Sequence, residues 1–136
     1  MSGNNSKIGG GGFHHLALKV FDFEKTLKFY MEGLGFKKYI SWGEGNERAI
    51  MLDTGDGNFL EIFAGGSEEK RPEGAFLHVA FRTENCDLAI EQAKAAGAEV
   101  TMIPTDVDIQ SEPVTKVRIA FCKGPDGEII EFFQNR

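Results

Sequence analysis

The alternation of apolar and polar residues predicts the same order of elements twice along the chain. Each copy begins with a short run of β-branched, aromatic and leucine residues, continues with an amphipathic helix, and closes with three further strands. The predicted strands are 13–20, 37–42, 49–53 and 58–63 in the first copy, then 76–82, 99–103, 117–122 and 129–134 in the second. Each copy is therefore predicted to be a βαβββ module.

The two predicted helices differ in composition but end in the same way. Asp22 is a plausible N-cap for the first helix. Glycines Gly35 and Gly97 close the two helices at corresponding positions. The residues that recur at helical spacing are Phe23, Leu27, Tyr30 and Leu34 in the first helix and Cys86, Ile90 and Ala93 in the second.

The repeat also extends to two residue types that could carry chemistry. The run "FHHLALKV" returns as "FLHVAFRT", which places His78 63 residues after His15. The runs "FLEIF" and "IIEFF" correspond in the same way, with Glu131 70 residues after Glu61. The same His and Glu therefore occur in the first and last strand of each module.

Polar, glycine-rich segments separate these modules. Residues 1–12 are predicted to form a flexible tail, and residues 13–136 a single domain. Within it, module one covers 13–63, a linker covers 64–75 and module two covers 76–134. Residues 104–116 are predicted to form a long loop that interrupts the second module.

The expected fold class is α+β. A four-stranded sheet with one helix cannot bury both of its faces, so two modules are expected to pair and to curve their mixed sheets around a common metal-binding cleft. In an alternative arrangement, each sheet packs against a helix on one face, as in a ferredoxin-like fold.

The composition and charge of the chain limit the classes of molecule that it could bind. The chain has 136 residues, a formal charge of −6 and a pI near 5.1, which argue against nucleic acid or an anionic membrane surface and favour a small-molecule ligand. No apolar stretch reaches the length of about 20 residues that spans a bilayer. Cys86 and Cys122 lack metal or redox spacing, so we interpret them as inert and expect a reducing cytoplasm.

The repeated His and Glu residues predict a metal site. Glu61 and Glu131 are flanked by apolar residues, where an unpaired carboxylate costs several kcal/mol. Pairing with Arg48 or Arg118, or projection at an exposed edge, would also explain them. Two imidazoles and two carboxylates suit Zn, Ni, Co, Mn or Fe(II) and leave positions for water on a six-coordinate ion.

His14 precedes His15 in the sequence and has no counterpart in the second copy. Neighbouring residues of a strand point to opposite faces of the sheet. The repeat selects His15 for the site, because Leu77 precedes His78. We therefore predict that His14 lies on the outer face.

These motifs resemble the vicinal oxygen chelate superfamily, which contains glyoxalase I, bleomycin-resistance proteins and extradiol dioxygenases. The resemblance rests on "HLALKVFDFEKTLKFYMEGLGF", "FLEIF", "HVAF" and "GPDGEIIEF" and covers about 13–133. It implies that His15, Glu61, His78 and Glu131 bind a divalent metal ion, with Zn or Ni favoured and Co, Mn or Fe as alternatives. Fosfomycin-resistance enzymes and extradiol dioxygenases do not use the position of Glu61 as a ligand, and methylmalonyl-CoA epimerase has Gln there, so the pattern is closest to glyoxalase I.

The resemblance also implies an activity. It predicts an enzyme, a metal-dependent lyase or isomerase that moves a proton between adjacent carbons of an α-hydroxy or α-oxo carbonyl adduct through a metal-stabilised enediolate. Glu131 would be the base and Glu61 its symmetric partner. The alternatives are a small-molecule binding or resistance protein, an epimerase and an Fe(II) dioxygenase. The family further implies a homodimer.

This chain departs from glyoxalase I where glutathione would bind. Family members commonly have a basic residue where this chain has Glu32, and an Asn-Trp pair where it has Ala64 and glycines. We therefore do not assume that glutathione is the substrate. The basic residues that could instead bind a substrate carboxylate are Lys70, Arg71, Lys116 and Arg118.

Overall fold

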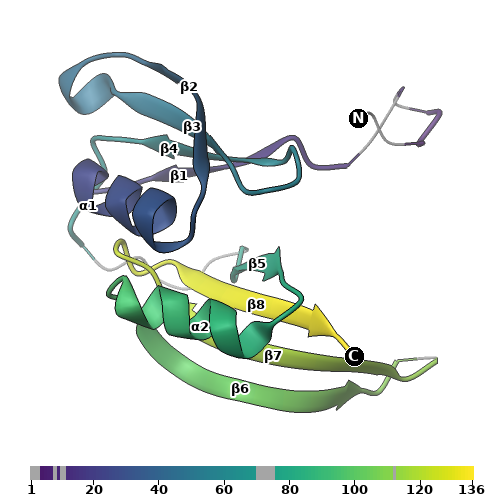
Figure 1. Cartoon of the computed structure of the whole chain (residues 1–136). Coiled ribbons are helices and arrows are strands. Elements are labelled where there is room, and N and C mark those ends of the chain that lie inside the picture. Colours follow the sequence, from purple (N-terminus) through teal and green to yellow (C-terminus); the bar gives the residue numbers. More distant parts are fainter. Residues whose placement is uncertain (1–3, 8, 10–11, 70–75, 112) are drawn as a thin grey trace. The chain divides into compact units, whose positions relative to one another are not determined.

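The structure contains two four-stranded mixed sheets. It is a computed structural model and describes residues 4–7, 9, 12–69, 76–111 and 113–136. The chain divides by contact into a first unit, residues 1–23 and 35–67, and a second unit, residues 24–34 and 68–136. Each unit contains one sheet and the helices are few (Figure 1), so the predicted α+β class is confirmed.

The first sheet has the strand order β1-β4-β3-β2. Its strands are β1 (His15–Lys19), β2 (Lys37–Trp42), β3 (Ala49–Asp53) and β4 (Phe59–Phe63), with a short 3-10 turn, η2 (Gly45–Glu47), between β2 and β3. β1 pairs in parallel with β4, and the other pairs are antiparallel. Alternation along the strands buries Leu52, Leu60 and Ile62 almost completely.

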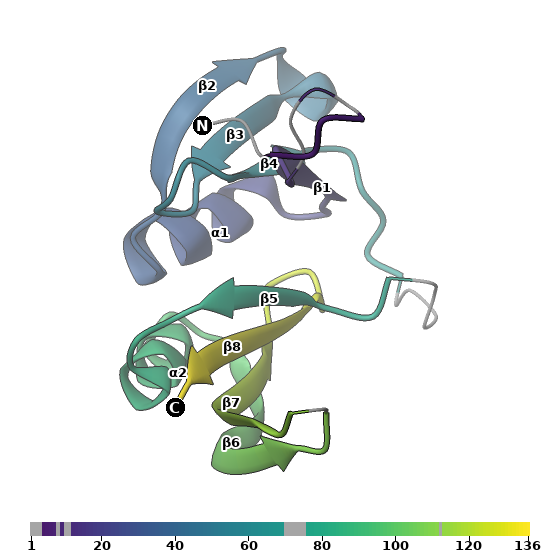
Figure 2. The ribbon, with the colours of Figure 1, turned by 90° about the vertical axis from the view of Figure 1, so that its right-hand side faces the viewer.

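The second sheet repeats this topology with the order β5-β8-β7-β6. Its strands are β5 (Val79–Arg82), β6 (Glu99–Ile109), β7 (Thr115–Lys123) and β8 (Ile129–Asn135). β5 and β8 are parallel, and the other neighbours are antiparallel. Helix α2 (Cys86–Ala95) lies against one face of this sheet (Figure 2).

Local interactions define both ends of α2. The Asn85 side chain accepts a hydrogen bond from the backbone N–H of Leu88 at 3.0 Å, an N-cap that typically contributes about 1 kcal/mol. Gln134 of β8 accepts another from the backbone N–H of Cys86 at 2.8 Å. Gly97 follows the helix with φ of 102°, a conformation that favours glycine. The prediction that this helix ends at Gly97 is confirmed.

The first helical segment changes its winding part-way. It starts as α1 (Phe23–Leu27) and continues as the π-helix η1 (Lys28–Gly33). Phe29 and Tyr30 are both buried, although the predicted helix face contained only Tyr30. Gly35 closes the segment with φ of 77°, as predicted.

From Glu24 onward, this segment belongs to the second unit by its contacts. The Tyr30 hydroxyl donates a hydrogen bond to Glu128 in the turn between β7 and β8, at 2.8 Å. η1 also contacts α2, where Gly33 leaves room for Ala96, because a Cβ at Gly33 would overlap the Ala96 Cβ. The helical part of the first repeat therefore packs against α2 and the β7–β8 turn of the second unit.

The prediction of a long loop over residues 104–116 is wrong. β6 and β7 form one extended hairpin, with pairs such as Asp106↔Arg118 and Ile109↔Thr115. β6 is an edge strand, and its register is irregular between Met102 and Thr105, which accommodates Pro104 between them. Alternating exposure along β6, rather than turn chemistry, identifies residues 105–109 as strand.

The first strands of the modules are shorter than predicted. β1 begins at His15 and β5 at Val79, while Phe13 and Phe76 are 91% and 93% exposed. His78 therefore lies just before β5. Parts of the predicted tail (1–3, 8, 10 and 11) and linker (70–75, with Lys70 and Arg71) lie outside the described residues.

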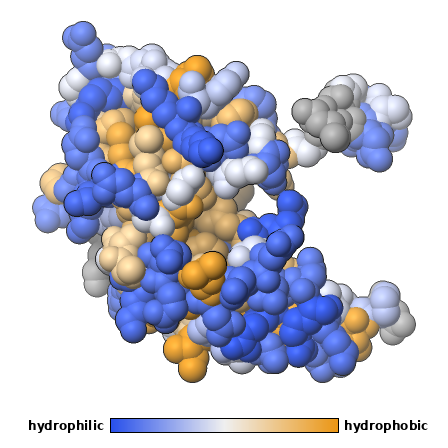
Figure 3. Space-filling view, viewed as in Figure 1, coloured by the Kyte–Doolittle hydropathy of each residue, from blue (hydrophilic) through white to orange (hydrophobic). Residues whose placement is uncertain are grey.

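Hydrophilic residues dominate the face over α2 and β6 in the view of Figure 3, with apolar residues scattered singly among them. Leu88 of α2 and Ile103 of β6 are 55% and 73% exposed. Isolated apolar side chains are normal on a protein surface. In the described residues, no helix combines the length and apolarity needed to cross a membrane.

Candidate metal centre

The strand register places His15 and Glu61 on one face of the first sheet. Ala17 of β1 lies opposite Glu61 of β4, and His15 lies two residues before Ala17. Because side chains alternate along a strand, residues two apart share a face, so His15 is a diagonal neighbour of Glu61.

The second sheet repeats this placement. Ala80 of β5 lies opposite Glu131 of β8, and His78 lies two residues before Ala80. The equivalence inferred from the sequence repeat is therefore also an equivalence of sheet positions. Short parallel pairing between the first and last strand of each module brings the His and Glu together.

Each pair is close, and the burial of the two pairs is nearly the same. His15 Nε2 lies 3.7 Å from Glu61 Oε1, and His78 Nε2 lies 3.0 Å from Glu131 Oε2. The imidazole side chains are 40% and 38% exposed, and the carboxylate side chains only 12% and 10%. In both modules a nearly buried carboxylate therefore meets a solvent-accessible imidazole.

Apolar side chains flank both carboxylates on the neighbouring strand. Met51 of β3 lies opposite Glu61, and Phe121 of β7 lies opposite Glu131. Phe121 also contacts the His78 ring edge-to-face, with the centroids 5.5 Å apart. Such surroundings lower the local dielectric and strengthen the interaction of a carboxylate with a cation.

Each His and Glu pair fits two ligands of one ion. Metal–ligand distances of about 2.0–2.2 Å place neighbouring donor atoms roughly 3.0–3.5 Å apart, and the two observed separations, 3.0 and 3.7 Å, are close to this range. Within the described ranges, no group of three or more His, Cys, Asp or Glu side chains is arranged to hold an ion. Each module presents two of the four predicted ligands.

His14 does not point away from His15 as predicted. Their Nδ1 atoms are 2.9 Å apart. β1 begins only at His15, so the alternation that would separate the two side chains does not constrain His14.

Among the described residues, no arginine forms an ion pair with either carboxylate. Arg48 Nε donates to the Gly45 carbonyl at 2.8 Å, and its guanidinium lies 4.6 Å from the centroid of the Phe23 ring. The side chains closest to Glu61 and Glu131 in these contacts are the histidines of their own modules. Pairing of the carboxylates with Arg48 or Arg118, one of the open interpretations, is therefore not observed.

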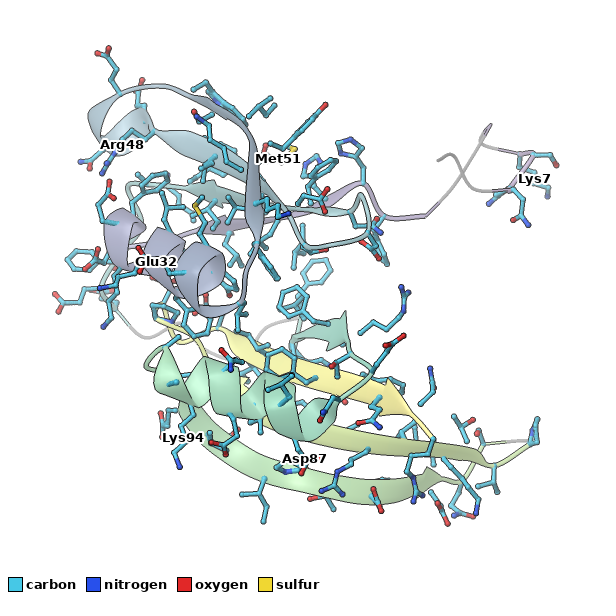
Figure 4. The ribbon with its side chains drawn as sticks, viewed as in Figure 1. Lys7, Glu32, Arg48, Met51, Asp87 and Lys94 are labelled. Carbon is cyan, nitrogen blue, oxygen red and sulfur yellow. The ribbon has the colours of Figure 1, made fainter. Side chains whose placement is uncertain are left out.

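Arg118 instead binds carboxylates on the helix side of the second sheet. It donates to Asp87 of α2 at 2.7 and 2.9 Å and to Asp106 of β6 at 3.0 Å. Figure 4 shows Asp87 on α2. These hydrogen bonds lower the pKa of Asp87 and raise that of Arg118. Arg118 is thus engaged away from Glu131 and is not a candidate to bind substrate there.

The sequence analysis did not identify two basic residues that lie near the His and Glu pairs. Lys19 lies opposite Phe63, and Arg82 lies opposite Phe133, each two residues beyond the partner of the module's Glu and on the same face. Both are exposed. The available signal was the repeat itself, because Arg82 follows Lys19 by the 63 residues that separate the histidines.

The cysteines are unsuited to nucleophilic chemistry. Cys86 and Cys122 are free thiols with no exposed surface. Burial raises the pKa of both, that of Cys122 to about 11. The thiolate is the reactive form, so both side chains are inert near neutral pH.

Comparison with known proteins shows which family the chain belongs to. Residues 12–132 match the model of the Glyoxalase/Bleomycin resistance protein/Dioxygenase superfamily. The chain belongs to this superfamily. The match covers nearly the same residues as the sequence motifs described above. It therefore confirms the resemblance to the vicinal oxygen chelate superfamily.

Individual members of the glyoxalase superfamily are similar over almost the whole chain. A probable lactoylglutathione lyase of Vibrio parahaemolyticus is 31% identical, over 93% of this chain and 92% of its own length. The crystal structure of a glyoxalase family protein from Enterococcus faecalis has a TM-score of 0.71 and 25% identity, covering 90% of this chain and 97% of its own. TnmS3, an antibiotic binding protein from Streptomyces sp. CB03234, shares the fold, with a TM-score of 0.70 and 21% identity, over 94% and 98%.

Proposed function

We propose that this protein is a metal-dependent lyase or isomerase of the glyoxalase type. His15, Glu61, His78 and Glu131 would bind one divalent ion, with Zn or Ni favoured. The observation that carries the proposal is the duplicated His and Glu pair, at the same sheet position and nearly the same burial in both modules. The relative named as a probable lactoylglutathione lyase supports the reaction class.

The donor set fits such an ion. Two imidazole nitrogens and two carboxylate oxygens form a site of intermediate softness, which suits Zn, Ni, Co, Mn or Fe. The two carboxylates also balance the charge of a divalent cation in apolar surroundings. An ion bound here would act as a Lewis acid, stabilising negative charge on substrate oxygens.

Glu131 would transfer the proton. Its carboxylate removes a proton from the carbon next to a carbonyl, and the same proton returns to the adjacent carbon, so the substrate is isomerised without an external oxidant or reductant. A base must reach within about 3 Å of the acidic C–H bond. Glu61, its equivalent in the first module, would be the symmetric partner, and His15 and His78 would bind the ion.

Lys19 and Arg82 favour a substrate with an anionic group. Both lie on the faces that carry the His and Glu pairs. Glu32 is exposed on η1 (Figure 4) and would disfavour a carboxylate near it. We propose the hemithioacetal of a 2-oxoaldehyde as the first substrate to test, with glutathione and with other thiols as the thiol component.

The first experiment is elemental analysis of the untagged full-length protein, followed by turnover of the methylglyoxal–glutathione hemithioacetal. We expect about one divalent ion per pair of modules and turnover that a chelator abolishes and Ni or Zn restores. Tight small-molecule binding without chelator-sensitive turnover of any thiol adduct would instead indicate a binding protein.

The second experiment tests the base. Glu131→Gln should lower kcat by about 10²–10⁴-fold, the usual contribution of a positioned base, while part of the metal affinity remains. Glu91→Gln, an identical change at an exposed position of α2, is the matched control and should retain full activity. Undiminished turnover by Glu131→Gln would refute the assigned role.

We also propose that the chain forms a homodimer, in keeping with its family. Light scattering coupled to size-exclusion chromatography should give twice the chain mass. A monomer with full activity would show that both modules of one chain complete the site.

A further inference from the structure

The ring of His14 is held between His15 and Phe59. Its Nδ1 lies 2.9 Å from that of His15, and the two rings meet edge-to-face with centroids 5.2 Å apart. The Phe59 ring centroid is also 5.2 Å from that of His14, and the Phe59 backbone N–H donates to the His14 carbonyl at 2.9 Å. Tyr39 stacks on Phe59 at 4.6 Å. His14 is thus positioned by a row of rings in the first unit.

The contact between the two Nδ1 atoms has a consequence for the proton of His15. A neutral imidazole carries one proton, so one ring must donate and the other accept. When His15 donates, its Nε2 keeps a free lone pair, and this atom is the one near Glu61. When His14 donates, His15 Nε2 carries the proton and cannot bind a cation.

We propose that His14 is a positioning residue whose Nδ1 accepts a hydrogen bond from the Nδ1–H of His15 and thereby favours the tautomer whose Nε2 binds the metal ion. Histidine ligands commonly donate their second N–H to such a partner, which fixes the tautomer and the ring orientation. The inference rests on the proposed metal site. It goes beyond it by assigning a role to a residue that the repeat excludes as a ligand.

The second module provides a natural contrast. Leu77 takes the place of His14 there, and its side chain cannot accept a hydrogen bond. His78 therefore depends on other contacts for its orientation, such as the Phe121 ring. The two halves of the site are equivalent in their ligands but differ in what supports the histidine.

The experiment compares wild type with His14→Leu, which reproduces the second module, and His14→Asn, whose side-chain oxygen can still accept a hydrogen bond. Nitrogen NMR of the imidazoles in the metal-free full-length protein reports the tautomer of His15. Competition with a chelator gives the Kd for Zn and Ni. Leu77→Ala, the change at the corresponding position of the second module, is the control.

We expect the Nδ1–H tautomer of His15 in wild type and in His14→Asn. In His14→Leu we expect a shift toward the Nε2–H tautomer and metal binding weaker by about 10-fold or more. Leu77→Ala should leave His15 unchanged. If wild type binds metal and His14→Leu changes neither tautomer nor Kd, the role of His14 is refuted; if wild type binds no metal, the proposed function fails as well.

Discussion

Replacing Tyr30 by Phe tests the link between the first-module helix and the β7–β8 turn of the second unit. Tyr30 has no exposed surface, and its hydroxyl donates to Glu128 Oε2 at 2.8 Å. The other carboxylate oxygen of Glu128 accepts from the Asp126 backbone N–H, also at 2.8 Å. Tyr30→Phe therefore leaves one oxygen of a half-buried carboxylate without this donor.

The expected cost follows from the type of hydrogen bond. A hydrogen bond to a charged group contributes about 1.5–3 kcal/mol. We therefore expect Tyr30→Phe to lower the free energy of unfolding by about 2 kcal/mol and, for a chain of this length, Tm by roughly 6 °C. Tyr39→Phe is the matched control, because Tyr39 is 57% exposed, and it should change stability by less than about 0.5 kcal/mol.

The loss should also depend on pH. Burial raises the pKa of Glu128, and the hydrogen bond from Tyr30 partly opposes that shift. A raised folded-state pKa stabilises the protein below the ordinary Glu value, and this stabilisation is lost as pH rises through the folded pKa. Tyr30→Phe raises the pKa further, so its deficit is largest at neutral pH and decreases as pH falls and the carboxyl is protonated.

Urea unfolding followed by circular dichroism, from acid to neutral pH, measures both effects. A double-mutant cycle with Glu128→Ala isolates the pair and should give a coupling energy above about 1 kcal/mol. A coupling energy near zero, or a Tyr30→Phe deficit that is constant across this pH range, would refute the reasoning.

Three further variants or treatments test packing in the two units. Gly33→Ala should destabilise the protein by about 1–2 kcal/mol despite the better helix propensity of alanine, because its Cβ would overlap that of Ala96; adding Ala96→Gly should recover part of the loss in thermal unfolding. Gly66→Ala should cost more, because its Cβ would lie 2.6 Å from the backbone carbon of Val20, and an unchanged Tm would contradict this packing. Cys122 should react slowly with a thiol reagent in the folded protein and rapidly in urea; fast labelling of the native state would contradict its burial.

The pattern of residues was sufficient for the parts of the structure that local periodicity controls. Alternation identified most strands, and glycines at the helix ends were correctly interpreted as stops. The repeat predicted which His and Glu are equivalent, and the register then placed each pair on one face. The predicted loop over 104–116 failed because Pro104 is a turn signal that an irregular edge strand can accommodate.

The sequence by itself thus determined the duplicated module and its four candidate ligands, because strand alternation and repetition are properties of neighbouring residues. Only the tertiary structure decided the partners of the remaining polar groups. Tyr30 meets Glu128 across 98 residues, and Arg118 meets Asp87 across 31. Such pairs form where packed elements happen to meet, so their partners depend on the three-dimensional arrangement and leave no periodic signal in the chain.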